Sequence, residues 1–274
     1  VYKRQDSSAN LLALPDIDFG IVPLHVIVGE NDYVDDDKID LTAMQKDLSS
    51  YKGKTSTSSP SPHEWENAFG DADVVFCITI TSTLSGTYNS AVIAKDIYEQ
   101  NHAGRKVYVL DSLSTGPEIA LFIEKIAELI KAGFTPDDIY KTLLEYKDKT
   151  HLYFSLASLN NFAKNGRISP VIAAGIGLLG VRVVGKASDE GTLLPLDKCR
   201  GEKRALKKLI DHLKECGYTD GKIIIAHNNN EAGALELKKL IENTFGIFNG
   251  KIQKTRALCS YYAEPGSLLI GFEA

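Results

Sequence analysis

Two stretches of this chain repeat the same order of elements, a buried strand, a polar loop and a helix, and that order strongly constrains the fold. Residues 73–80 (DVVFCITI) form an apolar, β-branched run that ends at the polar loop 81–87, and residues 85–100 place apolar side chains at helical spacing. Residues 106–111 are the next strand, followed by the loop SLSTG and a helix over 117–132. Strands separated by helices run parallel, so we expect an α/β fold with a crevice at the carboxyl ends of the strands.

The pattern changes near Thr150, and we place a domain boundary there. A chain of 274 residues is long enough for two modest domains. Beyond the boundary, residues 180–187 and 192–196 are expected strands, and the turn SDEG between them predicts an antiparallel hairpin. We therefore predict a mainly parallel α/β domain over residues 1–150 and a mixed α/β domain over residues 151–274.

The N-terminal residues show no predicted element. Residues 1–5 (VYKRQ) have no strand pattern and no initiating Met, and they match a translated sequencing adapter. We interpret them as a cloning or assembly scar joined to a truncated gene that has lost its first strand, and we exclude them from the fold. The first expected strand is then residues 21–28.

Charge and composition argue against several classes of function. The formal net charge is −5 with no long basic run, which disfavours a general binder of nucleic acids or anionic membranes. The longest apolar run, residues 171–181, is shorter than the roughly 20 residues of a spanning helix, so we expect no stable membrane insertion. The cysteines (Cys77, Cys199, Cys216 and Cys259) form no C-x-x-C pair, which is typical of free thiols in the cytoplasm. The histidines show no ligand spacing, so we predict no metal and no cofactor.

Two short loops rich in hydroxyl groups, residues 57–62 (TSSPSP) and 81–88 (TSTLSGTY), each open a predicted helix. A helix start presents free N–H groups and the positive end of the helix dipole, so it favours an anion, and serine and threonine add uncharged donors. Two such starts facing one crevice would bind a carboxylate or a phosphate. From the residues alone, each loop is also explained as an ordinary N-cap. Arg167, which follows Asn165 and Gly166, is also explained as a cation at a helix end.

Five elements together resemble the DegV family of bacterial fatty-acid-binding proteins, from Asp6 to nearly the end of the chain. In the family's order they are Asp6-Ser7 followed by IVPL at 21–24, the Thr-Ser-x-Pro-Ser-Pro motif at 57–62, the signature LSGTYNSA at 84–91, the Gly-Arg-Ile element at 166–169 (GRIS), and DEG at 189–191 with RG at 200–201. One element alone would be weak. Five elements in this order make a strong match.

The resemblance implies a DegV-like fold, in which a long-chain fatty acid lies between two α/β domains. It implies a cytoplasmic carrier and not an enzyme: the tail is enclosed by apolar side chains, and the carboxylate is presented to a separate fatty acid kinase that makes the acyl-phosphate. Carried over position by position, the residues that bind the carboxylate are Thr57, Ser58, Ser85, Gly86, Thr87, Arg167 and Tyr262.

One element departs from the family pattern. The family's C-terminal loop usually reads His-x-Gly-Pro-Gly, and here residues 262–266 read YAEPG, so that Tyr262 stands at the histidine and Glu264 at a glycine. A phenol donates one hydrogen bond but carries no positive charge near neutral pH. We therefore expect carboxylate binding to depend on Arg167 and the hydroxyl groups.

A fatty acid would gain most of its affinity from its tail. Burial of about fourteen methylenes contributes on the order of 11 kcal/mol, and association with tail ordering costs about 4 kcal/mol or more. Residues 171–179 (VIAAGIGLL) have the glycine- and alanine-rich composition that lets a chain pass close to the backbone. Ordinary core packing explains the same composition, and both interpretations stay open.

Two enzymatic alternatives use the same loops. The first is an α/β enzyme that binds a phosphorylated small metabolite, although the chain lacks both G-x-x-x-x-G-K-[ST] and G-x-G-x-x-G. The second is a serine hydrolase with Ser85 as nucleophile, although Leu84-Ser85-Gly86 does not match G-x-S-x-G.

Overall fold

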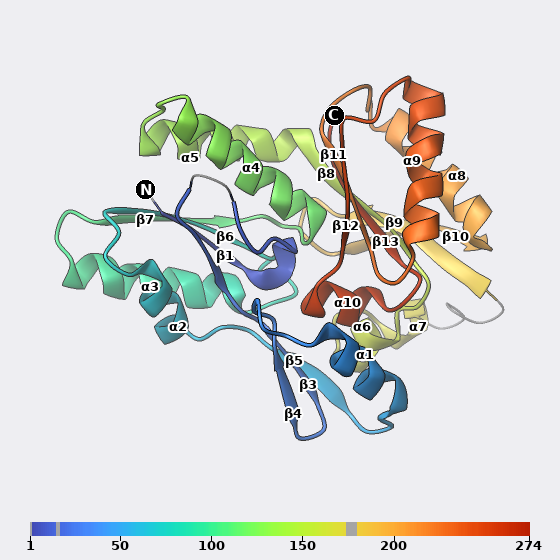
Figure 1. Ribbon diagram of the computed structural model, residues 1–274, viewed down its shortest axis with the longest axis horizontal. Coiled ribbons are helices and arrows are strands. Elements are labelled where there is room, and N and C mark those ends of the chain that lie inside the picture. Colours follow the sequence, from blue (N-terminus) through green and yellow to red (C-terminus); the bar gives the residue numbers. More distant parts are fainter. Residues whose placement is uncertain (1, 15–16, 174–179) are drawn as a thin grey trace.

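The computed structural model describes residues 2–14, 17–173 and 180–274, and its strands form three sheets (Figure 1). The first is a four-stranded parallel sheet in the order β2-β1-β6-β7, as predicted for the N-terminal half. Its strands are β1 (Tyr2–Asp6), β2 (Phe19–Val22), β6 (Val74–Thr79) and β7 (Lys106–Asp111). β6 is buried along nearly its whole length because helices cover both faces of a parallel sheet.

The second sheet is mixed and has six strands in the order β10-β9-β8-β13-β11-β12. Its neighbours are antiparallel except β11 and β12, which are parallel. The strands are β8 (Thr150–Leu156), β9 (Val181–Ala187), β10 (Leu193–Arg200), β11 (Ile223–His227), β12 (Gly250–Lys254) and β13 (Leu268–Glu273). The predicted hairpin is confirmed as β9–β10. Every strand of this sheet lies at or after Thr150, and the domain division at residue 150 stays a prediction.

The third sheet is small and antiparallel, and the sequence analysis did not predict it. It has the order β4-β3-β5, with β3 (His25–Val28), β4 (Asn31–Val34) and β5 (Thr55–Ser58), and α1 (Leu41–Ser50) packs against it. The single strand expected over residues 21–28 is therefore wrong. Pro23 has no N–H to donate to a sheet, and the chain passes from β2 to β3 at this residue.

The exclusion of residues 1–5 from the fold is also wrong for the residues that the structure describes. β1 pairs in parallel with β2 on one side and with β6 on the other, so it lies inside the first sheet. At its carboxyl end, the buried Asp6 accepts a hydrogen bond at Oδ2 from the Ile80 amide (2.5 Å). Burial raises the pKa of Asp6 to about 6. This strand therefore holds the start of the second hydroxyl loop in place.

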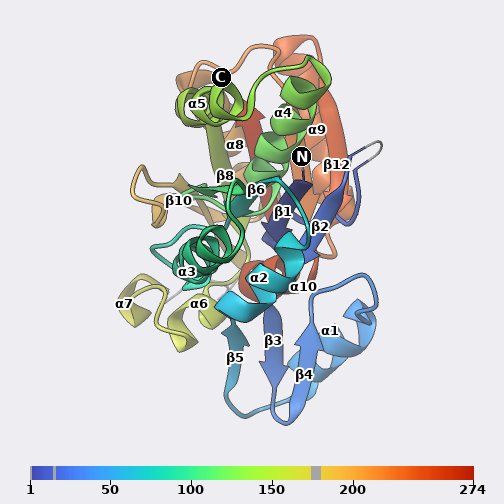
Figure 2. The same ribbon diagram turned by 90° about the vertical axis from the view of Figure 1, so that its left-hand side faces the viewer.

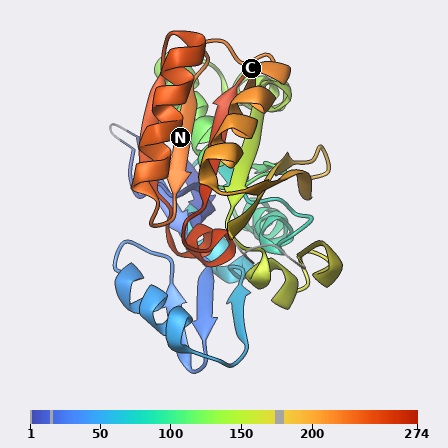
Figure 3. The ribbon, with the colours of Figure 1, turned by 90° about the vertical axis from the view of Figure 1, so that its right-hand side faces the viewer.

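Helices separate and cover the two larger sheets. α2 (Pro62–Phe69) and α3 (Thr87–Asn101) pack on the outer face of the first sheet, and α4 (Pro117–Lys131) lies between the two sheets with α5 (Pro136–Tyr146) beside it (Figure 2). α8 (Glu202–Glu215) and α9 (Glu231–Phe245), orange in Figure 3, cover the outer face of the second sheet. This layered arrangement brings the carboxyl ends of β6 and β7 next to the second sheet.

Three short helices complete the fold. α6 (Asn160–Lys164) and α7 (Pro170–Ala173) follow β8, and α10 (Ala257–Ala263), which was not predicted, precedes β13. Of the glycine- and alanine-rich segment 171–179, residues 174–179 lie outside the described part of the chain. Across the described ranges, no helix is both long and apolar enough to cross a membrane.

Candidate ligand-binding site

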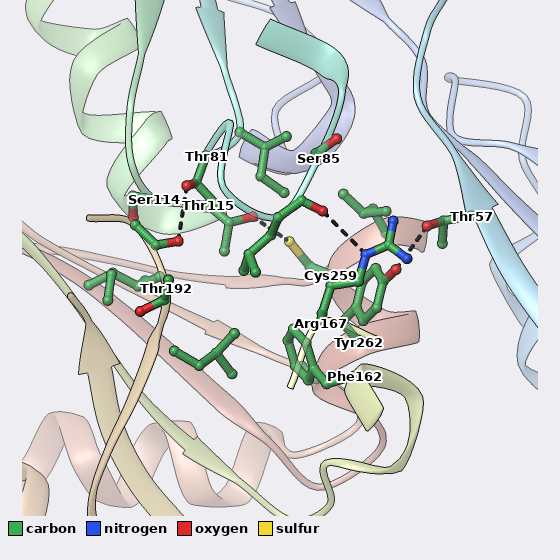
Figure 4. Close-up of a pocket in the computed structure, with 18 of the residues that line it drawn as sticks. Thr57, Thr81, Ser85, Ser114, Thr115, Phe162, Arg167, Thr192, Cys259 and Tyr262 are labelled. Carbon is green, nitrogen blue, oxygen red and sulfur yellow. Dashed lines mark hydrogen bonds between the residues drawn. The ribbon is translucent and has the colours of Figure 1, made fainter. Parts of the chain in front are cut away.

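A cavity of about 290 Å³ lies where the three sheets meet. Its walls come from the loops after β6 and β7, from β5, α6 and α10, from the second sheet, and from the tip of the β9–β10 hairpin. Most of the lining is apolar, and it includes Leu24, Ile80, Leu152, Phe154, Leu156, Leu193, Leu258, Ala263 and Leu269. Figure 4 places Thr57, Arg167 and Tyr262 toward one end of the cavity and Ser114 and Thr192 toward the other. We call these the polar end and the far end.

The two hydroxyl loops meet at the polar end. Ser58 and Ser59 line the cavity from the first loop, and Ser85 and Gly86 line it from the second. A Cβ atom placed on Gly86 would lie 3.4 Å from Ser59 Oγ, so the loops approach one another closely. The two loops thus lie side by side.

Thr87 has a different position from the other predicted residues. It is fully buried and is not among the described residues that line the cavity. Its Oγ1 lies 2.8 Å from Ser85 Oγ, and its backbone N–H donates to the same Ser85 oxygen. Thr87 therefore fixes the orientation of the Ser85 hydroxyl.

Arg167 is the only charged side chain among the described residues that line the cavity. Its Nε donates to the Leu84 carbonyl (3.2 Å) and its Nη1 donates to the Asn165 carbonyl (2.6 Å). Leu84 belongs to the second hydroxyl loop, so the arginine joins that loop to the turn after α6. A guanidinium held at two of its nitrogen atoms is preorganised to meet an anion.

Tyr262 extends from α10 into the polar end, where its Oη lies 2.9 Å from Thr57 Oγ1. Its ring packs on Phe162 of α6, with 4.8 Å between the centroids. Burial raises the pKa of Tyr262, more than the Thr57 hydroxyl and the positive charge of Arg167 lower it. Tyr262 is therefore a neutral phenol near pH 7 and can donate a hydrogen bond.

A buried carboxylate anchors α10. Asp35, which is fully buried, accepts hydrogen bonds from the amides of Ala257 (3.2 Å) and Leu258 (3.1 Å) at the start of this helix. Its Oδ1 also lies 3.3 Å from Arg256 Nε. Burial raises the pKa of Asp35, and the two amides and the guanidinium act against that rise. Asp35 thus positions the helix that carries Tyr262.

Cys259 lines the cavity from the same helix and is buried. Its Sγ donates to the Ser8 carbonyl (3.2 Å) and lies 3.8 Å from Thr115 Oγ1. Burial raises the pKa of Cys259 to about 12, so it remains a neutral thiol and adds to the apolar wall. In the described part of the chain, no group of three or more His, Cys, Asp or Glu side chains could hold a metal ion.

Six of the seven predicted site residues line the cavity, with Thr87 directly behind them. Other lining residues were missed by the sequence analysis. Ser114 and Thr115 follow β7 at its carboxyl end, and the rule that ligands bind at carboxyl ends of parallel strands would have pointed to them. No sequence signal placed Phe162 or Thr192 in the site, because both reach it through long-range packing.

The fold and cavity define an α/β protein with a largely apolar ligand site that has one cationic end. A family described as "Uncharacterised protein, DegV family" matches residues 5–274. A DegV domain-containing protein of Streptococcus pneumoniae is 41% identical over 255 residues, covering 93% of this chain and 91% of the relative. The chain therefore belongs to the DegV family.

Two solved structures are similar to this chain over almost their whole length. A DegV family protein from Eubacterium eligens, loaded with heptadecanoic acid, has a TM-score of 0.97 and 38% identity, covering 100% of this chain and 99% of the other. The Fatty Acid Kinase (Fak) B3 protein of Streptococcus pneumoniae, loaded with linoleic acid, has a TM-score of 0.97 and 39% identity, covering 99% and 98%.

Proposed function

We propose that this protein binds one long-chain fatty acid in the cavity, with the tail among the apolar side chains and the carboxylate at the polar end. The observation that carries the proposal is the lining itself: an apolar cavity in which one guanidinium and several hydroxyl groups stand at the same end. The tail supplies most of the affinity because each buried methylene contributes about 0.8 kcal/mol. The polar end sets the orientation of the acid.

The carboxylate would accept hydrogen bonds from Arg167, from the hydroxyls of Thr57, Ser58 and Ser85, and from the phenol of Tyr262. Thr87 would act indirectly, by orienting Ser85. A hydrogen bond to a charged group is about twice as strong as a neutral one, so Arg167 would contribute most. Gly86, which is exposed, leaves space for the head group to reach solvent.

We further propose that the protein is a carrier, which presents the acid to a fatty acid kinase in the cytoplasm. Support comes from the Streptococcus pneumoniae neighbour, whose name associates it with a fatty acid kinase. None of the four cysteines, all of which lie in the described ranges, forms a disulfide, which suits a reducing compartment. The partner of Ser85 Oγ is Thr87 Oγ1, an arrangement that offers no general base to activate Ser85 as a nucleophile.

The apolar lining also favours a fatty acid over the alternative of a phosphorylated metabolite. A small phosphorylated compound would leave the Leu and Phe side chains of this cavity facing a polar ligand. A phosphate-binding enzyme would more commonly surround its ligand with backbone N–H groups and several cations. Arg167, the one cation among the lining residues that the structure describes, matches a single carboxylate charge.

Mass spectrometry tests the binding. Purified protein is denatured and extracted, and we expect about one C14–C18 fatty acid per chain, with uptake of oleate after delipidation. A preparation that releases no acid and takes up no oleate would overturn the proposal.

A coupled assay tests the carrier step. The oleate-loaded protein is mixed with a purified fatty acid kinase and Mg-ATP, and acyl-phosphate is trapped with hydroxylamine. We expect acyl hydroxamate only when both proteins and oleate are present. Hydroxamate formed by this protein without the kinase would show that it is itself an enzyme.

A further inference from the structure

The tip of the β9–β10 hairpin lines the far end of the cavity. Gly191 and Thr192 of this tip line the cavity, and Gly191 is buried. The preceding residue, Glu190, is exposed to solvent. The hairpin tip therefore has residues that line the cavity next to a residue that is exposed to water.

Two side-chain hydrogen bonds hold the tip in place. Thr81 Oγ1 donates to the Gly191 carbonyl (2.9 Å), and Thr83 Oγ1 donates to the Glu190 carbonyl (2.6 Å). Both threonines belong to the second hydroxyl loop, which also contributes Ser85 to the polar end. The same loop thus forms part of both ends of the cavity.

The contact between the tip and this loop is close. A Cβ atom on Gly191 would lie 2.2 Å from Thr81 Oγ1 and 3.0 Å from Leu113 Cα, and the φ of Gly191 is +76°. Only glycine fits both the backbone conformation and this approach. The tip is therefore packed against the β6–α3 and β7–α4 loops.

The hydroxyl groups at the far end are already engaged within the protein. Thr81 Oγ1 donates to Gly191, Ser114 Oγ donates to Glu118, and Thr192 Oγ1 lies 2.9 Å from Ser188 Oγ. A carboxylate on a ligand, which can only accept, would have to compete with an acceptor within the protein for these protons. The far end thus suits the methyl terminus of an acyl chain.

We propose that the hairpin tip is the end stop of the acyl channel and sets the longest fatty acid that the protein binds. This inference rests on the proposed function. A chain too long for the cavity must push the tip away and break both threonine bonds. Two hydrogen bonds of ordinary net strength correspond to about one order of magnitude in affinity.

The test compares acids of different length on the delipidated full chain. The double variant Thr81→Val/Thr83→Val keeps the side-chain shape but removes both hydroxyl donors. We expect it to lower the ratio of the Kd for erucate (C22) to the Kd for oleate (C18) by about tenfold. The opposite variant, Ala187→Leu, adds volume at a lining position beside the tip. It should raise the ratio of the Kd for oleate to the Kd for myristoleate (C14).

The matched control is Thr142→Val on α5, which removes a similar hydroxyl-to-carbonyl bond, to Asp138, away from the cavity and should leave both ratios unchanged. Wild-type ratios in both test variants would overturn the end stop while leaving fatty-acid binding intact. A wild-type protein that binds none of the three acids would instead refute the proposed function. If the double threonine variant does not fold, the ratio measured for Ala187→Leu decides alone.

Discussion

Replacement of Arg167 by alanine tests the polar end most directly. The guanidinium is the only charge among the described lining residues, and Nε and Nη1 also hold the carbonyls of Leu84 and Asn165. The substitution therefore removes two things: a charged donor for the carboxylate and a link between the second hydroxyl loop and the turn after α6. A useful experiment must separate these effects.

The magnitude follows from the type of contact. A hydrogen bond to a charged group contributes about 1.5–3 kcal/mol net, so Arg167→Ala should weaken oleate binding by about 10- to 150-fold. The tail contacts remain, and micromolar binding should persist because the methylenes supply most of the affinity. Arg167→Lys keeps the charge but loses the planar fork, and we expect an intermediate loss.

The assay uses two ligands that share one tail. Oleate and oleyl alcohol are titrated against the wild-type protein and Arg167→Ala, by competition with a fluorescent fatty acid. Only oleate carries a carboxylate, so the difference between the two losses isolates the charge interaction, as in a double-mutant cycle. We expect the alcohol to lose less than about threefold, the scale of one weak neutral hydrogen bond. Equal losses for acid and alcohol would refute a contact between Arg167 and the carboxylate.

Three further predictions concern Tyr262, Glu118 and Asp35. Tyr262→Phe should weaken oleate binding by about 0.5–1.5 kcal/mol, and a cycle with Thr57→Val, measured by titration, should show coupling because the two hydroxyls are bonded. Burial raises the pKa of Glu118 from 4.5 to about 7, so the folded state favours the protonated side chain. The contribution of Glu118 to wild-type stability is therefore fully present below pH 4.5 and is lost as the pH rises through about 7. Glu118→Gln should therefore gain about 3 kcal/mol relative to the wild type between pH 4.5 and 8, measured by urea unfolding. Asp35→Ala should lower the free energy of unfolding by about 3–5 kcal/mol because it leaves the partly buried Arg256 without its carboxylate and the α10 amides without their acceptor.

Each of these predictions has a clear contrary result. Additive effects in the tyrosine–threonine cycle would mean that their bond does not act in binding. If the difference in free energy of unfolding between Glu118→Gln and the wild type does not change with pH, the raised pKa of Glu118 is contradicted. Asp35→Asn keeps one acceptor for the α10 amides, so it should lose less than Asp35→Ala, and equal losses would contradict the capping role.

Much of the first sheet could be predicted from local sequence. Residues 73–80 and 106–111 are apolar and β-branched, and both became buried parallel strands, β6 and β7. The loop 57–62 was predicted to open a helix, and α2 begins at Pro62, where Ser61 and Glu64 form a capping box. These features depend on residues within about four positions of one another, and the sequence displays them directly.

The errors arose where a strand depends on its neighbours. Residues 2–6 have no apolar alternation, yet β1 lies between β2 and β6 because both sides offer a parallel partner. The run 21–28 looks like one strand, but its halves pair in different sheets. Pairing is a tertiary property, and a short strand takes its stability from the strands beside it.

By itself, the sequence determined the α/β class, the two hydroxyl loops and the family motifs that named six lining residues. The tertiary structure alone decided how these residues meet. Thr57 bonds to Tyr262, 205 residues away, and Thr81 bonds to Gly191, 110 residues away. Periodicity and capping report contacts within one or two helical turns, whereas the ends of a cavity are made by segments that only the packing of the sheets brings together.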